Sequence, residues 1–351
     1  MHRIGIWNTA FLGDAVLTLP LIQSLRATFP DASLDFWVRR GVGSLFTAHP
    51  DIAAVHEFDK KGGLSGALQS AKAIRHSHYD LWINAHTSPR SALMTLNARL
   101  GGARMTIGYD APFYNKLVHS RTVDRRFHEL DEIERLLQLA HPVSALAPIQ
   151  EQSWPHLALP AEAHAAAEAY WQANVRGPVL GMHPGSVWAT KRWTVDGFAE
   201  VARRAVSQGA HVMLFAGPSE VDVANDVIRR AHLKSAIFPD GTPALLNVAG
   251  KLSLTELGAY LARLNCYISN DSGPMHMAWA QHTPITAIFG PTVRQLGFYP
   301  RGPKTTVLEA TLDCRPCGLH GPQVCPQKHH NCMRHVTADM VWADVKGKLF
   351  G

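Results

Sequence analysis

The chain has 351 residues, of which 46% are hydrophobic and 18% are charged; this composition is typical of a soluble protein long enough for two α/β domains. Its formal net charge of +6 favours acidic ligands such as nucleotide diphosphates, phosphorylated lipids or an anionic membrane face. No long Lys/Arg run or zinc-finger spacing accompanies that charge, so we do not expect nucleic acid as a partner. No apolar run of about 18 residues predicts a spanning helix, and the first residues do not resemble a signal peptide. We therefore expect a cytoplasmic protein.

Short apolar runs alternate with helical patterns in the first 110 residues, as in a parallel α/β sheet. Pro20 lies inside the first helical pattern and should kink that helix, because it removes one backbone hydrogen bond. The predicted strands are 3–7, 33–38, 53–58, 80–85 and 105–109, and the predicted helices are about 14–28, 43–49, 63–77 and 89–99.

A proline-containing stretch, 141–160, predicts a linker, after which the alternation resumes. The sequence Ser253-Leu254-Thr255-Glu256 has the form of a capping box and predicts a helix start. The predicted strands of this half are 179–183, 211–216, 266–270 and 285–289, and the predicted helices are 161–175, 195–208, 219–231, 254–264 and 273–281. Because ligands of such sheets bind at the carboxyl ends of the strands, we expect loops of both domains to line a cleft.

The first loop contains Gly13, which permits a tight turn, followed by Asp14 at the start of a helix. The carboxylate of Asp14 could act as a catalytic base in the cleft, or it could simply cap the helix. The residues alone leave both interpretations open.

The loop 183–193 follows a buried strand and offers the backbone of Gly185, the hydroxyl of Ser186 and the charge of Lys191. These groups suit a phosphate or diphosphate, although a solvated surface loop is the alternative. Glu220 follows the next glycine turn, where a carboxylate can bind ribose hydroxyls or favour the helix dipole.

The segment 270–276 ends a strand, makes a turn and starts a helix at a proline, which is a favoured first helical position. Ser272, Gly273 and the helix N–H groups could hold phosphate oxygens, and Asp271 could bind sugar hydroxyls. The alternative is that Asp271 caps the helix and that His276 is a structural core residue.

Four of the five cysteines occur within twenty residues, near several histidines. Four thiolates at this spacing could bind a structural zinc or iron ion, whereas a disulfide is not expected in a reducing compartment. Reduced thiols packed in a loop are the other interpretation. The candidate ligands are Cys314, Cys317, Cys325 and Cys332.

These loops, in this order, resemble glycosyltransferase family 9, the bacterial lipopolysaccharide heptosyltransferases. The Cys-rich tail is similar to that of many members called heptosyltransferase II. The sequences that carry the resemblance are LGDAVLTLP (12–20), LRATFPDASLDFWV (25–38), HPGSVWATKRW (183–193), FAGPSE (215–220) and NDSGPMHMA (270–278).

The resemblance implies a GT-B fold, in which two Rossmann-like domains with parallel sheets face a central cleft. The implied domains are an acceptor-binding domain at 1–160, a nucleotide-sugar-binding domain at 161–336 and a helix at 337–351 that returns to the first domain. The implied activity is the transfer, with inversion and without a catalytic metal, of heptose from ADP-heptose to the heptosyl-Kdo-lipid A inner core. The enzyme would work at the cytoplasmic face of the inner membrane as a peripheral protein.

Position by position, Asp14 matches the family's general base, and Lys191 matches the lysine that stabilises the departing ADP. Glu220 falls where a carboxylate contacts the adenosine ribose, and Asp271 where heptose hydroxyls are bound. Gly185-Ser186 stands where some members have a Thr pair, which puts one phosphate-contacting hydroxyl in doubt. The remaining expected contacts are Ser272, Gly273 and His276 for the donor, and Gly13, Arg39, Arg40 and Arg90 for the acceptor.

Other readings of the sequence remain. A different family 9 acceptor, such as the first or third core heptose position or a protein, is the nearest. A nucleotide-dependent dehydrogenase is disfavoured because no G-x-G-x-x-G follows the first strand. A non-catalytic sugar-nucleotide-binding protein is disfavoured because both Asp14 and Lys191 are present.

Overall fold

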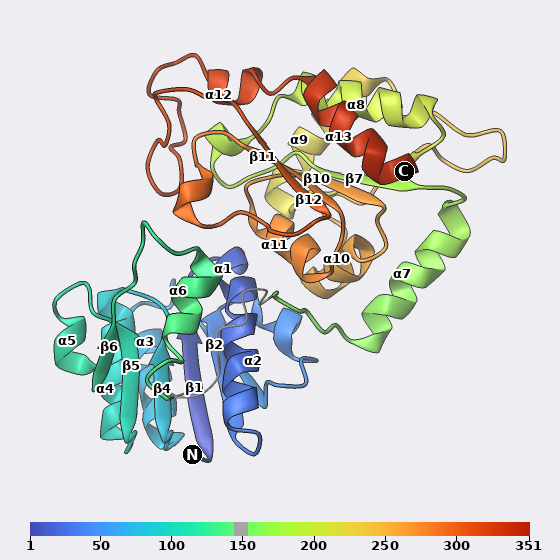
Figure 1. Cartoon of the computed structure of the whole chain (residues 1–351). Helices are drawn as coiled ribbons and strands as arrows, with labels where there is room; N and C mark the ends of the chain where they lie inside the picture. The colour runs from blue at the N-terminus through green and yellow to red at the C-terminus, as the bar shows by residue number, and fades with distance from the viewer. Residues whose placement is uncertain (144–153) are drawn as a thin grey trace. The chain divides into compact units, whose positions relative to one another are not determined.

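A computed structural model describes residues 1–143 and 154–351. The chain divides into two compact units, Met1–Pro160 and Ala161–Gly351, and each contains one six-stranded sheet (Figure 1). All strand pairings within the two sheets are parallel. Part of the predicted linker, 144–153, lies outside the described residues.

The first unit has the strand order β3-β2-β1-β4-β5-β6. Its strands are β1 (Arg3–Asn8), β2 (Ser33–Arg39), β3 (Ala54–Phe58), β4 (Leu81–Asn84), β5 (Met105–Tyr109) and β6 (Arg121–Val123). Its helices are α1 (Leu12–Leu17), α2 (Leu19–Thr28), the 3-10 turn η1 (Gly43–Phe46), α3 (Gly63–His76), α4 (Pro89–Leu100), α5 (Asn115–Val118) and α6 (Glu132–Gln138).

The two faces of the first sheet are covered by different helices. On one face, α3 and α4 bury Ile74 and Met94 against a cluster of aromatic side chains that includes Trp7, Trp37 and Trp82. On the other face, α2 and α6 contact each other. Because both faces are covered, the central strands β1 and β4 are buried along most of their length, as parallel strands in the middle of a sheet are.

The second unit repeats this plan with the strand order β12-β11-β10-β7-β8-β9. Its strands are β7 (Val179–His183), β8 (His211–Leu214), β9 (Leu245–Asn247), β10 (Cys266–Asn270), β11 (Ile285–Phe289) and β12 (Thr305–Glu309). Its helices are α7 (Ala161–Asn174), α8 (Val195–Ser207), α9 (Val221–Ala231), α10 (Leu254–Leu261), α11 (Gly273–Ala280), α12 (Asn331–Arg334) and α13 (Ala338–Phe350), with 3-10 turns η2 (Ala189–Lys191), η3 (Pro218–Glu220) and η4 (Arg294–Leu296). The predicted capping box is present: Ser253 accepts from the Glu256 N–H, and the Glu256 carboxylate accepts from the Ser253 N–H.

The first predicted helix is wrong in one respect, since it is two helices and not one kinked helix. The α1 helix ends before Thr18, and Pro20 stands in the first turn of α2. At that position its missing N–H would have no helical partner in any case.

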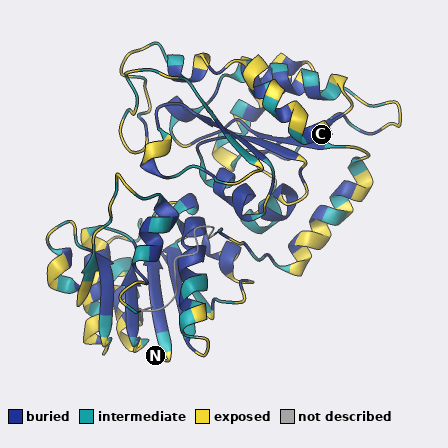
Figure 2. Ribbon diagram, in the orientation of Figure 1, coloured by how far each residue is buried: buried dark blue, intermediate teal, exposed yellow. Residues whose placement is uncertain are grey.

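The helix expected at 337–351 is present as α13 (Ala338–Phe350) and packs in the second unit. The α13 helix buries Val341, Val345 and Leu349 in the core of the second unit, and it packs on α8 and on β10, β11 and β12. This apolar stripe is used within the second unit, which is where the structure places the helix. Figure 2 shows the central strands of both sheets coloured as buried.

Candidate active site

A buried ion pair lies at the carboxyl edge of the second sheet. The Lys191 ammonium donates to Asp271 Oδ2 at 2.6 Å, and Thr292 Oγ1 donates to the same oxygen at 2.7 Å. Lys191 and Asp271 are only 8% and 7% exposed. Such a buried charge pair is costly to desolvate, so its presence at a loop edge indicates a site that uses the charge. Sequence reasoning missed Thr292, which comes from the loop after β11.

Asn270 holds residues 184–193, which we call the Lys191 loop, against the end of β10. Its side-chain amide donates to the carbonyls of Pro184 and Gly185, both at 3.0 Å, and its Oδ1 accepts from the Trp193 N–H at 2.8 Å. The side chain is completely buried. One asparagine therefore fixes both ends of the loop that presents Lys191.

The start of α11 brings His276 beside the ion pair. Burial lowers the pKa of His276 to about 4, with Lys191 lowering it further and Asp271 opposing the shift. Its Nδ1 is buried and has no hydrogen-bond partner in the protein. Ser272 is at the N-cap position of the same helix without a capping hydrogen bond from its side chain, and its hydroxyl lies 3.2 Å from that of Ser269. At neutral pH the imidazole is therefore uncharged and can hydrogen-bond a ligand.

Glu220 lies next to the Lys191 loop. Its carboxylate is 3.4 Å from His183 Nε2, and it occupies the space where a side chain on Gly185 would be. Burial raises the pKa of Glu220, but the hydrogen bond and charge of His183, a backbone hydrogen bond at Gly217 and the charge of Arg192 outweigh it, so the pKa lies below its usual range. Glu220 is therefore an ionised carboxylate at the same sheet edge as Lys191.

In the first unit, Asp14 is half-buried in the first turn of α1. Its Oδ2 accepts from the Phe11 N–H at 2.9 Å, so the residue does cap its helix. Its main-chain carbonyl is held by the side chains of Asn8 and Thr18. Gly13 is buried in the same turn. Capping and catalysis are compatible, because a carboxylate has two oxygens and several lone pairs.

Basic side chains gather around Asp14. The charge of Asp14 acts on Lys60 and on Arg125. Burial lowers the pKa of Lys60, and the nearby charges of Arg39 and Arg90 lower it further. Because β1, β2 and β3 pair in parallel, the loop after β3 that carries Lys60 and the loop after β1 that leads to α1 leave the same edge of the sheet. Lys60 therefore lies within electrostatic reach of Asp14, Arg39 and Arg90, and Arg125 lies within reach of Asp14; the sequence analysis had singled out neither Lys60 nor Arg125.

Arg40 behaves differently from this group. It forms an exposed ion pair with Asp59 at 2.7 Å, and such a surface pair contributes little to stability. Arg39 instead lies over the ring of Phe11, 5.7 Å from its centroid. The structure thus separates the two neighbouring arginines that the sequence analysis treated alike.

Arg125 is fixed in place by a buried acid. Its guanidinium donates to both carboxylate oxygens of Glu132, at 3.0 and 2.9 Å. It also lies over the ring of Tyr109, 5.3 Å from the centroid, while Arg135 approaches Glu132 at 3.0 Å. Burial lowers the pKa of His86 to about 4, and Lys60 and Arg125 lower it further. This edge therefore presents fixed positive charge beside a carboxylate and a neutral imidazole.

The Cys-rich segment, residues 314–332, packs on the Lys191 loop. The Gln323 side chain accepts from the Ala189 N–H at 3.1 Å and donates to the Val187 carbonyl at 3.0 Å. His330 Nε2 lies 2.7 Å from the carbonyl of Thr190. The segment therefore supports the loop that carries Lys191, a role that the sequence analysis did not assign to it.

The four cysteines are the residues that the sequence suggested as ligands of a structural metal. Within residues 1–143 and 154–351, no group of three or more His, Cys, Asp or Glu side chains could hold a metal ion. Cys332 is buried in the core of the second unit, and the Cys317 thiol donates to the carbonyl of Cys314 at 3.2 Å. All four, Cys325 included, are free thiols. Burial raises the pKa of Cys332 to about 11, and the charges of Cys317, Cys325 and Cys314 raise it further, so the four thiols lie within electrostatic reach of one another.

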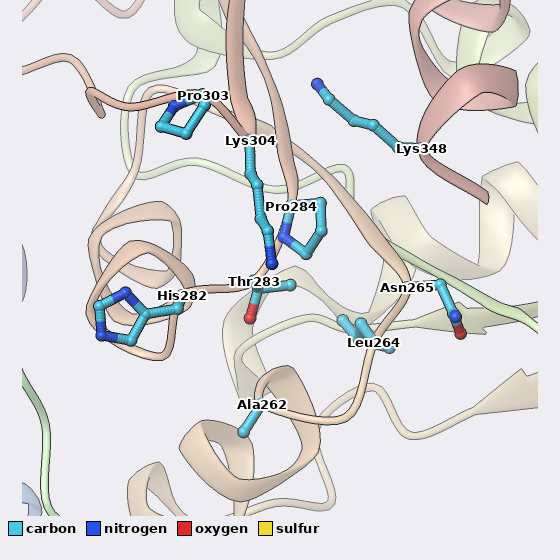
Figure 3. Close-up of a pocket in the computed structure, with 9 residues that line it drawn as sticks. All are labelled: Ala262, Leu264, Asn265, His282, Thr283, Pro284, Pro303, Lys304 and Lys348. Atoms are coloured by element: carbon cyan, nitrogen blue, oxygen red, sulfur yellow. The ribbon is translucent and has the colours of Figure 1, made fainter. Parts of the chain in front are cut away.

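A cavity of about 530 Å³ lies elsewhere in the second unit (Figure 3). Its lining includes residues just before β10, β11 and β12, such as Asn265, Pro284 and Lys304. Lys348 also lines it, but its ammonium is bonded to Ile285 O, at 2.7 Å, and to Asp344, at 2.6 Å. This cavity is at the opposite edge of the sheet from Lys191 and is separate from the candidate site.

Two α/β units, each with a parallel six-stranded sheet, are the architecture of the GT-B fold. The chain belongs to glycosyltransferase family 9 (heptosyltransferase), whose model matches residues 67–323. It is therefore a glycosyltransferase, and the family predicted from the sequence motifs is confirmed.

Individual relatives are distant but cover most of the chain. The lipopolysaccharide core heptosyltransferase OpsX of Haemophilus influenzae is 25% identical, over 81% of this chain and 78% of its own. Lipopolysaccharide heptosyltransferase 3 of Escherichia coli is 26% identical over 80% of each chain. The structure of the E. coli ADP-heptose LPS heptosyltransferase II has a TM-score of 0.78 at 21% identity and covers 99% of this chain and 98% of its own, which confirms the fold.

In the described part of the chain, no helix combines the length and apolar character that crossing a bilayer requires.

Proposed function

We propose that this protein transfers L-glycero-D-manno-heptose from ADP-heptose to the heptosyl-Kdo-lipid A inner core of lipopolysaccharide. The observation that carries the proposal is the buried Lys191–Asp271 pair at the sheet edge of a family 9 chain. Relatives named for lipopolysaccharide heptosyltransfer support the substrates. We place the reaction in the cytoplasm, at the inner face of the membrane that holds the acceptor lipid.

The second unit would bind the donor. Lys191 and the N–H groups at the start of α11 would take the negative charge that develops on the diphosphate as ADP leaves. Glu220 would accept hydrogen bonds from the ribose hydroxyls, and Asp271 from the hydroxyls of the heptose. Ser186, His276 and the backbone of Gly185 and Gly273 would complete the donor contacts. In this proposal the Lys191 ammonium and the helix N–H groups stabilise the diphosphate, which a metal ion does in other transferases.

The first unit would bind the acceptor. Asp14 would take the proton of the acceptor hydroxyl while the hydroxyl oxygen forms its bond to the anomeric carbon. The bond from that carbon to the ADP oxygen breaks on the opposite face, which inverts the anomeric centre. Arg39, Lys60, Arg90 and Arg125 would attract the phosphate and carboxylate groups of the inner core, since arginine pairs well with such oxyanions.

The test is an assay of ADP release from ADP-heptose with a matched series of deacylated core acceptors that carry no, one or two heptoses. We expect turnover to be highest with the one-heptose acceptor, a product heavier by one heptose residue, and activity that survives a metal chelator. If turnover is instead highest with the acceptor that carries no heptose or two heptoses, the enzyme adds the first or the third heptose. No ADP release above that of an Asp14→Asn variant, with any acceptor, would contradict it.

A second prediction concerns the donor pocket. In a Gly185→Ala variant the new Cβ would lie 2.5 to 2.7 Å from the Glu220 carboxyl group, so the carboxylate must move. We expect ADP affinity, measured by calorimetry, to fall by about 10-fold or more, because hydrogen bonds to a charged group contribute about 1.5–3 kcal/mol.

Gly217→Ala is the matched control. A Cβ there would lie 3.5 Å from Glu220 Oε2, which is ordinary contact, and the residue has a negative φ of −68° that alanine can adopt. Equal ADP affinity in the two variants would show that Glu220 does not contact the nucleotide.

A further inference from the structure

The positive charge of the chain is concentrated in one segment. Residues 60–121 contain nine Lys and Arg but only two acids, Asp80 and Asp110. The remaining residues contain 25 Lys and Arg and 26 Asp and Glu, so they are nearly neutral. The segment comprises α3, β4, α4, β5 and α5, and these three helices have no acidic residue. The net positive charge of the chain is therefore located in this segment of the first unit.

Large apolar side chains are exposed on the same three helices. Seven of the fifteen large hydrophobic residues exposed in the described part of the chain lie here. They are Leu64 and Leu68 on α3, Leu93, Leu96 and Leu100 on α4, and Phe113 and Leu117 at α5. Leu64, Leu68, Phe113 and Leu117 are between 66% and 84% exposed. Clusters of exposed apolar side chains mark interaction sites on soluble proteins.

The apolar and basic residues share a face because of helical spacing. On α3, Leu64 and Leu68 are followed at four- and three-residue steps by Lys72 and Arg75, all exposed. The opposite side of this helix buries Ala71 and Ile74 in the core. Residues three or four apart lie on one side of a helix. The side of α3 that faces solvent is thus apolar at its start and basic at its end.

The three helices are neighbours. The α4 helix contacts both α3 and α5, and Arg99 on α4 donates to the carbonyls of Leu117 and Val118 at 3.3 Å. Figure 2 shows exposed residues along α3, α4 and α5. We call the seven apolar residues, with Lys72, Arg75, Arg104, Lys116 and Arg121, the α3–α5 surface.

This surface begins at the sheet edge that carries Asp14. The α4 helix follows the carboxyl end of β4, and Arg90 in its first turn donates to the Lys60 carbonyl at 3.4 Å. Lys60 in turn lies within the electrostatic reach of Asp14. An acceptor anchored by its lipid tail must present its sugar at this edge while the tail remains in a bilayer.

We propose that the α3–α5 surface docks the enzyme on an anionic bilayer, with its leucines and phenylalanine in the headgroup region and its basic residues on acidic lipids. The proposal rests on the proposed function for the lipid-linked acceptor. Apolar side chains flanked by Lys and Arg are the composition of surfaces that lie in a membrane interface, and each basic residue adds attraction to an anionic leaflet. Two of the basic residues pair with acids, Arg104 with Asp80 at 3.9 Å and Lys116 with Asp110 at 3.7 Å. The excess of basic over acidic residues favours a negatively charged bilayer over a protein partner, whose surface normally carries both signs in balance.

The first experiment measures binding of the purified full chain to vesicles without substrates. We expect it to sediment with phosphatidylcholine vesicles that contain phosphatidylglycerol, to bind pure phosphatidylcholine weakly, and to be released by salt. Equal binding to both vesicle types would overturn the proposal. So would the absence of vesicle binding, including the case in which the chain self-associates through this face.

Two triple variants test whether the α3–α5 surface is the part of the chain that binds the vesicles. Lys72→Gln/Arg104→Gln/Lys116→Gln should lower partition to anionic vesicles by about two orders of magnitude. Leu68→Gln/Leu100→Gln/Leu117→Gln should lower it by at least about 10-fold, because those side chains no longer gain from burial. Glutamine is a good helix former, so the helices should remain folded.

Two matched control variants remove three basic or three exposed apolar side chains from the second unit. They are Arg203→Gln/Arg229→Gln/Lys346→Gln for charge and Ile237→Gln/Met340→Gln/Phe350→Gln for exposed apolar area. Both controls should bind vesicles like the wild type. If a control loses as much binding as its α3–α5 counterpart, general charge or hydrophobicity is the cause and the proposal is wrong.

Activity separates this proposal from the proposed function. The α3–α5 variants should retain wild-type turnover with a soluble, deacylated acceptor and lose it with the same acceptor embedded in anionic vesicles. If the wild type transfers heptose to neither acceptor, the proposed function fails while the vesicle measurements still decide the docking surface. Equal loss with both acceptors would show that the surface acts in catalysis and not in docking.

Discussion

Replacement of Asp14 by asparagine is expected to lower kcat by about 10²–10⁴-fold, the usual contribution of a general base. The structure makes asparagine the informative substitution. Asp14 caps its own helix through the Phe11 N–H, and an asparagine side-chain oxygen can accept the same hydrogen bond. The variant therefore removes the base and keeps the cap.

The control is Asp14→Ala, which removes both. It should lose the same turnover and, in addition, stability, since loss of a helix cap costs about 0.5–2 kcal/mol. Thermal unfolding and ADP affinity should be unchanged in the asparagine variant. If that variant keeps wild-type turnover, Asp14 is only a cap and the base must be sought elsewhere at that edge.

Replacement of Lys191 by methionine should have the second large effect. We expect kcat to fall by about 10²–10³-fold, as when an electrostatic partner of the developing charge is removed, and ADP affinity to fall with it. Stability should also fall, because Asp271 would remain buried after losing the Lys191 ammonium, with the Thr292 hydroxyl still donating to it. Breaking one side of a buried pair costs about 3–5 kcal/mol.

The double variant Lys191→Met/Asp271→Asn separates the two effects. It removes both charges of the pair, so its stability should return close to that of the wild type. Its ADP affinity and turnover should stay low, because the cation is still missing. Restored ADP affinity in the double variant would mean that Lys191 serves only to neutralise Asp271, and the diphosphate role would have to be abandoned.

The strands that sequence reasoning located are those with continuous apolar runs between turn residues, such as β7, β10 and β11. Buried parallel strands have this pattern because both of their faces are covered. Sequence reasoning missed β6, β9 and β12, which are three to five residues long and partly exposed. A short, half-exposed edge strand does not differ from a loop in composition.

The site shows the same division. Asp14, Lys191, Glu220 and Asp271 were found because each follows a strand and lies beside a glycine turn. Thr292 was missed, since a threonine after a strand is ordinary until Asp271 is seen to accept its hydroxyl. The contacts of the Cys-rich segment with the loop that carries Lys191 were also missed, because contacts between segments far apart in the sequence cannot be read from local spacing.

By itself the sequence determined the fold class, the family and the residues that the loops could offer. Those follow from local patterns: apolar runs, glycine turns and five motifs in a fixed order. Only the tertiary structure decided which charges are buried and which are neighbours. Lys60 and Arg125 look like solvated residues in their Lys-Lys and Arg-Arg pairs, yet folding places both within reach of Asp14. Electrostatic interaction depends on distance and burial, and neither can be read from separation along a chain.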